Sequence, residues 1–377
     1  MSKHLFGLIV TPYGQAANNR GETDGNITTL QKVLWKNEAH TTVSAEAIRW
    51  AMRYFWQRND PTSVNRVWDD DKSDHHWEDK DWKGWNPSVG GGKIYADDDL
   101  LGYMAALAAS KENDEQYAIP QHQRELQEAI NEAEGDTKKE AKAKKNLEDF
   151  ESNHAKLKAK WEQLSTVNSQ DKEATSKLEK EIKDLRRNMK LKGVTLNRRG
   201  ALEVTRAISL SPFDGDITFN SKSGRTKSST SLYMTEVHAT RYQYGFALTP
   251  EPPYLRVPAR VLDVIDAVIS LSEVAGNQSR FLYDFAPDSV VFRWTEDFAP
   301  RMLYGFEMDA KANLSFPAIL EKVDKGDIVA GELHIGGKIV STLDDAARRT
   351  LKGALLNEGV KAAAQGLKDR IKTDLSL

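Results

Sequence analysis

The hydrophobic pattern at the start of the chain changes from that of a strand to that of a helix. An apolar run within Lys3–Tyr13 predicts a buried strand that ends at Pro12 and Gly14. A short helix is expected near Thr28–Asn37. Apolar residues recur at helical spacing across Thr42–Arg58, where Ser44 is suited to cap the first turn. The first part of the chain is therefore expected to form a strand followed by helices.

Strand patterns return in the second half. Ala201–Leu210, His238–Leu248 and Ser289–Trp294 read as strands, and Ala259–Val274 reads as a helix with one apolar side. Shorter strands are expected within Ile328–Ile335 and at Ile339–Val340. The combined order is that of a βαββαβ sheet of the RRM-like or ferredoxin-like type. We predict an α+β fold built on such a palm.

Residues 111–192 have a different pattern, with acidic and basic side chains in equal number and almost no proline or glycine. Apolar or aromatic residues alternate at spacings of three and four, which is typical of a coiled-coil seam. A second stretch with this pattern follows a polar break. The sequence thus predicts an inserted antiparallel hairpin of two helices, whose first seam comprises Leu147, Phe150, His154, Leu157, Trp161 and Leu164.

Residues 59–99 are rich in tryptophan and acidic residues and show neither the helical nor the strand spacing of apolar residues. We therefore expect an extended, partly ordered excursion. The predicted organisation has four parts. They are residues 1–110, the first part of the palm with the excursion 59–99; 111–192, the helical insertion; 193–345, the second part of the palm with a hairpin at 211–236; and 346–377, a helical tail.

The composition of the 377 residues narrows the possible functions. The absence of cysteine excludes disulfides, thiol nucleophiles and thiolate metal sites, and it suits the reducing cytoplasm, where we expect the protein. No apolar run is long enough to span a membrane. The net charge of −3 does not by itself favour a nucleic acid partner.

Two regions nevertheless concentrate basic side chains. Arg49 and Arg53 lie four residues apart on the predicted helix, and Lys32 and Lys36 form a similar pair upstream, near Arg20. Such donors suit phosphate groups. The alternative is an ordinary solvated helix face in which Glu46 pairs with Arg49.

The second region, Ile217–Thr235, contains no acidic residue and many hydroxyl side chains, and its three bases are Lys222, Arg225 and Lys227. This segment lies between two predicted strands, and its composition favours a hairpin that contacts a phosphate backbone. The alternative is an ordinary surface loop.

The next strand carries an aromatic pattern. Alternation places His238, Tyr244 and Phe246 on one face and Arg241 on the other. Tyr244–Ala247 faintly resembles the aromatic stacking motif of RRM domains, although such a face is more often core. The polar loop Gly276–Arg280 separates the last predicted helix from the next strand.

An enzyme is the competing interpretation. His75 and His76, with neighbouring aspartates, could ligate a divalent cation, but adjacent histidines point in different directions on most backbones. Nucleophile-elbow and phosphate-loop motifs are absent from the sequence. We therefore predict no catalytic residue, no metal and no cofactor.

The combination of motifs resembles the DevR family of CRISPR proteins, the Cascade backbone subunit of type I-B systems within the RAMP superfamily. The resembling segments occur in the same order across nearly the whole chain outside the insertion. They are LFGLIVTPYGQAANNRGETDGNITTLQKV, HTTVSAEAIRWAMR, YADDDLLGYM, the ISLSPFDGD–SLYMTEVHATRYQYGFAL block and AGNQSRFLYDFAPDSVVFR.

This resemblance implies a non-catalytic, RNA-binding protein whose copies polymerise as a helical filament along a guide RNA (crRNA). Ile217–Leu232 would be a thumb that folds over the RNA and displaces one nucleotide per protomer. The other implied partners are target DNA, paired through the guide, and further Cascade subunits: the large subunit, the RAMP subunit that caps the 5′ handle and the crRNA-processing subunit. The implied RNA-binding residues are Arg20, Lys32, Lys36, His40, Ser44, Arg49, Arg53, Lys222, Arg225, Lys227, His238, Arg241, Asn277, Gln278 and Arg280.

Two further functions and the role of the insertion stay open. Related type III subunits cut target RNA with a loop aspartate, and the acidic excursion offers many aspartates. The insertion, which is longer than the family pattern needs, is either an arm that contacts a neighbouring subunit or an ornament, and a scaffold built on it is a third function. Its charges sum to zero and residues 69–99 sum to −6, which leaves about +3 for the rest of the chain.

Overall fold

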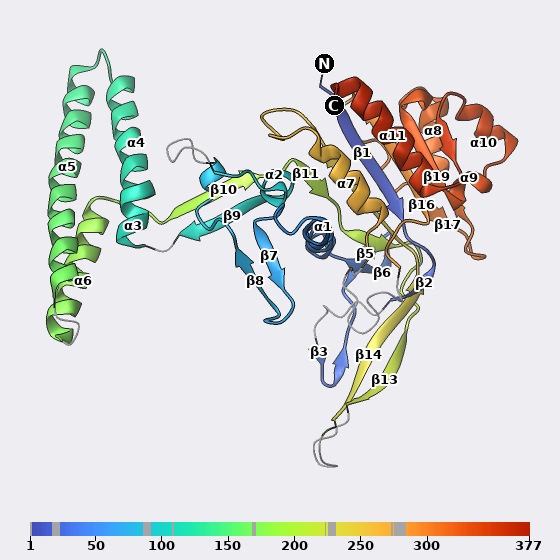
Figure 1. The fold of residues 1–377 in the computed structure, drawn as a ribbon, viewed down its shortest axis with the longest axis horizontal. Coiled ribbons are helices and arrows are strands. Elements are labelled where there is room, and N and C mark those ends of the chain that lie inside the picture. The colour runs from blue at the N-terminus through green and yellow to red at the C-terminus, as the bar shows by residue number, and fades with distance from the viewer. Residues whose placement is uncertain are drawn as a thin grey trace. The chain divides into compact units, whose positions relative to one another are not determined.

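The chain divides into two compact units in the computed structural model (Figure 1). The structure describes residues 2–16, 23–85, 92–107, 109–167, 171–222, 224, 231–272, 274 and 284–377. The first unit comprises Met1–Gly102 and Arg199–Leu377, and the second comprises Tyr103–Arg198. Helices and sheets are both present, which confirms the mixed α+β class.

A nine-stranded sheet forms the centre of the first unit, as far as the described residues extend. Its strands follow the order β20-β19-β16-β1-β15-β12-β6-β5, and β11 lies beside β15. In chain order they are β1 His4–Val10, β5 Lys32–Trp35, β6 Glu38–Val43, β11 Leu202–Val204, β12 Ala207–Ser209, β15 Tyr242–Leu248, β16 Ser289–Thr295, β19 Leu333–Gly337 and β20 Leu355–Asn357.

Strand β1 is buried along its whole length because both of its edges and both of its faces are covered. It pairs antiparallel with β15 on one side and with β16 on the other, so that Leu8 lies opposite both Gly245 and Val291. Helix α7 (Arg260–Ile269) joins these two flanking strands. The apolar run that predicted a buried strand thus forms the middle of the sheet.

Alternate residues of β1 face two different cores. Leu5 and Ile9 pack in a core with residues of α1 (Ala45–Asn59), α7 and α11 (Val360–Leu375). Phe6, Leu8 and Val10 pack in a second core with residues of α8 (Pro317–Asp324) and α9 (Lys338–Ser341). The sheet therefore separates two apolar layers.

Three local predictions in this unit were wrong. Residues 28–37 contain β4 (Ile27–Thr28) and β5 rather than a helix, and burial alternates along β5 with a period of two. Ile339–Val340 lies in α9, not in a strand. The tail is not wholly helical, because β20 lies between α10 (Asp345–Thr350) and α11 and pairs parallel with β19.

The described part of the acidic excursion is folded rather than extended. It contains a β-hairpin, β7 (Arg66–Asp69) with β8 (Asp74–Trp77), then the turn η1 (Lys83–Trp85) and α2 (Ala96–Leu101). Three consecutive aspartates of α2 are buried and hold the surrounding segments. Asp97 pairs with Arg53 of α1 at 3.1 Å, and Asp99 pairs with Arg260 of α7 at 2.7 Å.

The second unit has three long helices where two were predicted. They are α4 (Ile119–Glu132), α5 (Thr137–Thr166) and α6 (Lys172–Asn188), preceded by the short α3 (Lys111–Asn113) and a π turn, η2 (Asp114–Ala118). Strands β9 (Gly102–Leu107) and β10 (Val194–Arg199) pair with each other in a two-stranded sheet. The predicted seam supplies Phe150, Leu157 and Trp161 to the core, but Ile119 of the unpredicted α4 completes it.

Among the described residues, no helix combines the length and apolar content needed to cross a membrane.

We expect Arg53→Ala to destabilise the protein by about 3 kcal/mol, because it leaves the buried Asp97 carboxylate without its cation. Arg49 is the matched control on the same helix, because its pair with Glu46 is exposed. Arg49→Ala should change the unfolding free energy by less than about 0.5 kcal/mol. Urea denaturation followed by circular dichroism measures both variants, and equal losses would contradict a structural role for the Arg53–Asp97 pair.

Candidate nucleic-acid interface

A β-hairpin, β13 (Asp216–Lys222) with β14 (Ser231–Thr240), projects from the first unit (Figure 1). Its register pairs Asp216 with Val237 and continues without a bulge to Lys222 and Ser231. The hairpin contains the acid-free segment Ile217–Thr235, with Asp216 and Glu236 directly on either side of that segment. In the described residues, β2 (Gly14–Ala16) and β4 pair with β14, and β3 (Thr23–Asp24) pairs with β4.

One face of this hairpin carries three exposed apolar side chains. Residues directly opposite in the register share a face, so Ile217 and Phe219 lie on the same side as Leu232. Their exposed fractions are 47%, 66% and 52%, respectively. Sequence reasoning did not single out these residues; the signal was their alternation within a hydroxyl-rich segment.

Lys32 reaches the root of the hairpin from β5. Its Nζ lies 2.6 Å from Oε2 of Glu236 and 4.2 Å from the ring centroid of Phe213. Glu236 also accepts a hydrogen bond from the backbone N–H of Leu30 at 2.7 Å. Lys32 thus pairs with the first acidic residue after the acid-free segment. Lys36, in contrast, is exposed in the turn between β5 and β6, where its φ is 49°.

Two predicted residues, His40 and His238, are instead part of a buried polar network. His40 Nδ1 lies 2.7 Å from the carbonyl oxygen of Ser209, and His238 Nδ1 lies 2.8 Å from the hydroxyl of Thr41. That hydroxyl also lies 2.8 Å from the hydroxyl of Tyr242. Burial lowers the pKa of His238, so its ring is neutral near pH 7 and carries no charge for a phosphate.

Arg241 is also buried rather than presented to a ligand. It follows the last residue of β14, is 4% exposed, and its Nη1 donates to the carbonyl oxygen of Thr11 at 2.9 Å. The same nitrogen pairs with Asp288 at 2.6 Å. The expected alternation fails here because the strand is interrupted at Arg241, where the chain passes from the hairpin into β15.

The aromatic face of β15 belongs to the core. Tyr244 is fully buried and Phe246 is 1% exposed, and both pack in the cluster that includes α1 and α7. These rings therefore do not act as an RRM stacking motif, because both are buried in the core and no base can reach them.

Helix α1 presents its predicted residues in different ways. Ser44 caps the helix by accepting a hydrogen bond from the backbone N–H of Ala47. Arg49 lies 3.1 Å from Glu46, which is the alternative that the sequence left open. Arg53 is turned inward to Asp97, so the two arginines do not form one phosphate-binding pair.

The remaining predicted residues lie outside the described part of the chain. They are Arg20, Arg225, Lys227, Asn277, Gln278 and Arg280, together with the side chain of Lys222. Of the predicted set, the structure therefore places Lys32 at the hairpin root and leaves Lys36 exposed. It places His40, Arg53, His238 and Arg241 in structural contacts.

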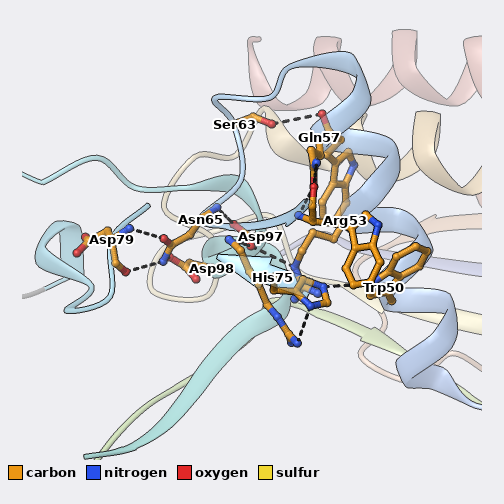
Figure 2. Close-up of polar contacts among 12 residues, drawn as sticks. Trp50, Arg53, Gln57, Ser63, Asn65, His75, Asp79, Asp97 and Asp98 are labelled. Carbon is orange, nitrogen blue, oxygen red and sulfur yellow. Dashed lines mark hydrogen bonds and ion pairs between the residues drawn. The ribbon is translucent and has the colours of Figure 1, made fainter. Parts of the chain in front are cut away.

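The excursion does not assemble its histidines at one point. Figure 2 shows His75 directed toward Trp50, whose Nε1 donates to His75 Nε2 at 3.2 Å. His76, the next residue of β8, instead lies 3.2 Å from Glu78. Within the described ranges, no group of three histidine or acidic side chains is placed to hold a metal ion.

Asn65 and two aspartates of α2 form the centre of this region (Figure 2). The Asn65 amide donates to Asp98 at 2.9 Å, its backbone N–H donates to Asp97 at 2.7 Å, and Trp82 Nε1 donates to Asp98 at 3.1 Å. Burial, and then the negative charge of Asp97, raises the pKa of Asp98 to about 7. The cluster thus fixes α2 against the β7 side of the excursion.

Comparison with known proteins identifies the family. A protein of Myxococcus xanthus (strain DK1622) described as "CRISPR-associated protein Cas7/Cst2/DevR" is 38% identical over 380 residues, which cover 99% of each chain. The chain belongs to the Cas7/Cst2/DevR family. A search of protein-family models gave no match.

Two solved structures resemble this family member more distantly. One, a "CRISPR RNA-guided surveillance complex, pre-nicking", has a TM-score of 0.47 and 9% identity, and covers 98% of this chain and 100% of its own. The other, a "CRISPR RNA-guided surveillance complex", has a TM-score of 0.46 and 10% identity, with 98% and 99% covered. At these scores the likeness is too weak to specify the fold.

The raised pKa of Asp98 predicts a pH dependence of stability for this family member. Between pH 4 and about 7 the folded state holds a proton that the unfolded state has released, so the unfolding free energy falls as the pH rises through this range. In the Asp98→Asn variant, the decrease in unfolding free energy over this pH range should be smaller by up to about 4 kcal/mol.

Thermal unfolding of both proteins across pH 4 to 8 measures the difference. Asp266→Asn is the control, because Asp266 pairs with Lys368 at a partly exposed position. Parallel stability profiles for the wild type and Asp98→Asn would contradict the assignment.

Proposed function

We propose that this protein is a guide-RNA-binding backbone subunit of a Cascade-type CRISPR complex of type I-B. Membership of the Cas7/Cst2/DevR family supports this class of function. Within the molecule, the observation that carries the proposal is the projecting hairpin β13–β14, which contains the acid-free segment Ile217–Thr235 and exposes side chains of that segment. In this proposal, the subunit is non-catalytic and acts in the cytoplasm without a cofactor.

In this proposal the nine-stranded sheet is an RRM-like palm and β13–β14 is the thumb. The strand order β16-β1-β15-β12, with α1 and α7 as the two connecting helices, supports the palm. The position of Lys32 at the hairpin root supports the thumb, because a cation there neutralises Glu236 and weakens the acidic repulsion of phosphate at the root.

The thumb holds the RNA by charge and shape. Lys222, Arg225 and Lys227 contact the guide backbone, and Lys36 and Arg20 are further phosphate contacts in this proposal. The bases remain available to pair with target DNA, so sequence is read by the guide and not by the protein. Asn277, Gln278 and Arg280 add a further RNA contact in this proposal.

Several copies bind side by side as a helical filament along one crRNA. The filament joins the other Cascade subunits: the large subunit, the RAMP subunit that caps the 5′ handle and the crRNA-processing subunit. Hydroxyl side chains near the thumb allow close approach of the backbone, which suits a contact repeated at every protomer.

The salt dependence of RNA affinity tests the thumb. The double variant Lys222→Ala with Arg225→Ala should bind single-stranded RNA more weakly, because two phosphate contacts are lost. The slope of log affinity against log salt should fall by about 0.7 for each lost contact. Fluorescence anisotropy with a labelled spacer-length RNA measures this slope.

Lys156→Ala with Lys158→Ala is the matched control, because it removes the same charge from exposed positions on α5. Its slope should equal that of the wild type. An unchanged slope in the hairpin variant, or an equal change in the control, would contradict the proposed contact. Failure of the wild-type protein to bind RNA at low salt would overturn the function itself.

A further inference from the structure

The second unit contains a polar recess of about 430 Å³, which we call the basic recess. One side is lined by Gln121, His122 and Glu125 of α4, and the other side by the segment that follows α6. That segment contributes Lys190 and Lys192. Both lysines are exposed, and in the described ranges neither pairs with an acidic side chain. Two ammonium groups are therefore available at this surface.

The basic recess lies on a second acid-free segment of the sequence. Residues 185–202 contain six basic side chains and no acidic one, whereas the acid-free part of the β13–β14 hairpin has three basic side chains. Three of the six pair with acidic residues: Arg186 with Asp114, Arg187 with Asp184 and Arg199 with Glu203. Sequence reasoning did not single out this segment, because the charges of the insertion balance when they are summed over its whole length.

Contacts at the end of α6 fix the positions of the two lysines. The Arg186 guanidinium forms two bonds with the buried carboxylate of Asp114, at 2.5 and 2.8 Å. The chain then turns at Lys190, whose φ is 55°, and the backbone N–H of Leu191 donates to the carbonyl oxygen of Arg186 at 3.0 Å. These bonds close the last turn of the helix, so the recess is preformed.

Glu125 is the acidic residue in the described lining of the recess. Its two carboxylate oxygens lie 3.1 Å from His122 Nδ1 and 3.1 Å from Gln121 Nε2. The hydrogen bond with His122, and then the one with Gln121, lowers the pKa of Glu125, so this carboxylate is ionised near pH 7. Two lysines and one carboxylate leave the lining with a net charge of about +1 when His122 is counted as neutral.

The first unit carries an exposed turn of opposite charge between β7 and β8 (Figure 1). Residues 69–81 contain seven acidic side chains and two basic ones. Three of the acidic residues at this turn, Asp70, Asp71 and Asp74, are exposed, and we call them the acidic turn. The chain therefore presents a convex acidic surface as well as a basic recess.

Hydrogen bonds hold the acidic turn in place but do not supply a cation. Asp70 accepts hydrogen bonds from Trp68 Nε1 at 2.9 Å and from the Tyr54 hydroxyl at 3.1 Å, and both donors are neutral. Lys72, which lies within the turn, pairs with Asp69 at 2.8 Å. As far as the structure describes the chain, none of the three aspartates of the acidic turn pairs with a lysine or an arginine. Their charges are thus available to a partner.

We infer that the acidic turn of one copy docks in the basic recess of a second copy, where its carboxylates pair with Lys190 and Lys192. Two different surfaces meet, so the contact is heterologous and repeats along a row of copies. Charge complementarity favours this occupant, because the chain itself supplies both halves. A phosphate backbone is the competing occupant, but Glu125 in the lining opposes its closely spaced charges.

This inference goes beyond the proposed function and rests on it only for the place of the contact in the filament. Exposed ion pairs are individually weak and are screened by salt. The contact should therefore strengthen at low ionic strength and should orient neighbouring copies rather than hold them together alone. It gives the helical unit a role, contact with a neighbouring copy, that the sequence left open.

Carbodiimide crosslinking tests the contact directly, because this reagent joins a lysine to a carboxylate that is paired with it. Full-length ¹⁵N-labelled and unlabelled proteins are mixed at low salt, treated with the reagent and analysed by mass spectrometry. Peptides that join Lys190 or Lys192 of one isotope to the acidic turn of the other should form. Such mixed pairs come only from two copies, so their absence would overturn the inference.

Charge reversal tests the same contact without a crosslinker. The recess variant is Lys190→Glu with Lys192→Glu, and the turn variant is Asp71→Lys with Asp74→Lys; all four positions are exposed, so both variants should fold. Each variant alone should self-associate at least about tenfold more weakly at low salt, because like charges then face each other. An equimolar mixture should recover the association, because every recess again meets a turn of opposite charge.

Analytical ultracentrifugation measures this association. Lys156→Glu with Lys158→Glu is the matched control, because it makes the same charge change at exposed positions on α5, and it should associate like the wild type. A mixture of the recess and turn variants that stays as weak as either variant alone, or an equal loss in the control, would contradict the contact.

RNA binding separates this inference from the proposed function. The recess variant should match the control variant in its affinity for an RNA short enough to bind one protomer. If the recess variant binds that RNA more weakly than the control and the mixture does not recover association, the recess holds phosphate and the inference fails alone. If the wild type fails to bind RNA but the mixture recovers association, the proposed function fails and the contact stands.

Discussion

The direction of the hairpin depends on a buried junction between the main sheet and the hairpin, where the pairing of β1 with β15 gives way to the pairing of β2 with β14. Strand β1 pairs with β15, and one step further along the chain β2 pairs with β14. Arg241 lies at this step and binds both the carbonyl oxygen of Thr11 and the carboxylate of Asp288. Because a buried guanidinium cannot be left unpaired without a large loss of stability, these contacts fix where the main sheet ends and the hairpin begins.

Neighbouring contacts strengthen the same junction. The backbone N–H of Tyr242 donates to the Thr11 hydroxyl at 2.9 Å, and the network of Thr41 and His238 lies beside it. None of these groups has a charge or an exposed atom to offer RNA. Their role is to hold the hairpin at a defined angle to the sheet, and the exposed residues of the hairpin then provide the binding surface.

The sequence predicted the parts of the fold that depend on local pattern. The buried strand β1, the capped helix α1 and strand β16 all have periodic apolar residues, and the structure has them close to the expected positions. The local pattern of residues 28–37 did not show that they contain strands, because β5 lies at the edge of the sheet and is held by β6 across a short turn. Strand β6 is in turn held in the sheet by β12, which is distant in the sequence. Helix α4 was missed because its apolar stripe is completed only by packing on α5.

The candidate site was less predictable for a related reason. Basic residues can be counted in a sequence, but the sequence does not show which of them pair with buried acidic residues in the folded chain. Arg53 and Arg241 looked like phosphate donors until Asp97 and Asp288 were found beside them. The acidic residues of the excursion were misleading in the same way. Asp97, Asp98 and Asp99 are buried, so they contribute little to the charge of the surface.

The central claim is that the hairpin β13–β14 lies on bound RNA. The most direct measurement is ultraviolet crosslinking of the full-length protein to a spacer-length RNA, followed by mass spectrometry of the crosslinked peptides. We predict crosslinks concentrated in residues 216–240 and in the segment of β5 that contains Lys32. Crosslinks confined to the helical unit Tyr103–Arg198, with none in the hairpin, would contradict it.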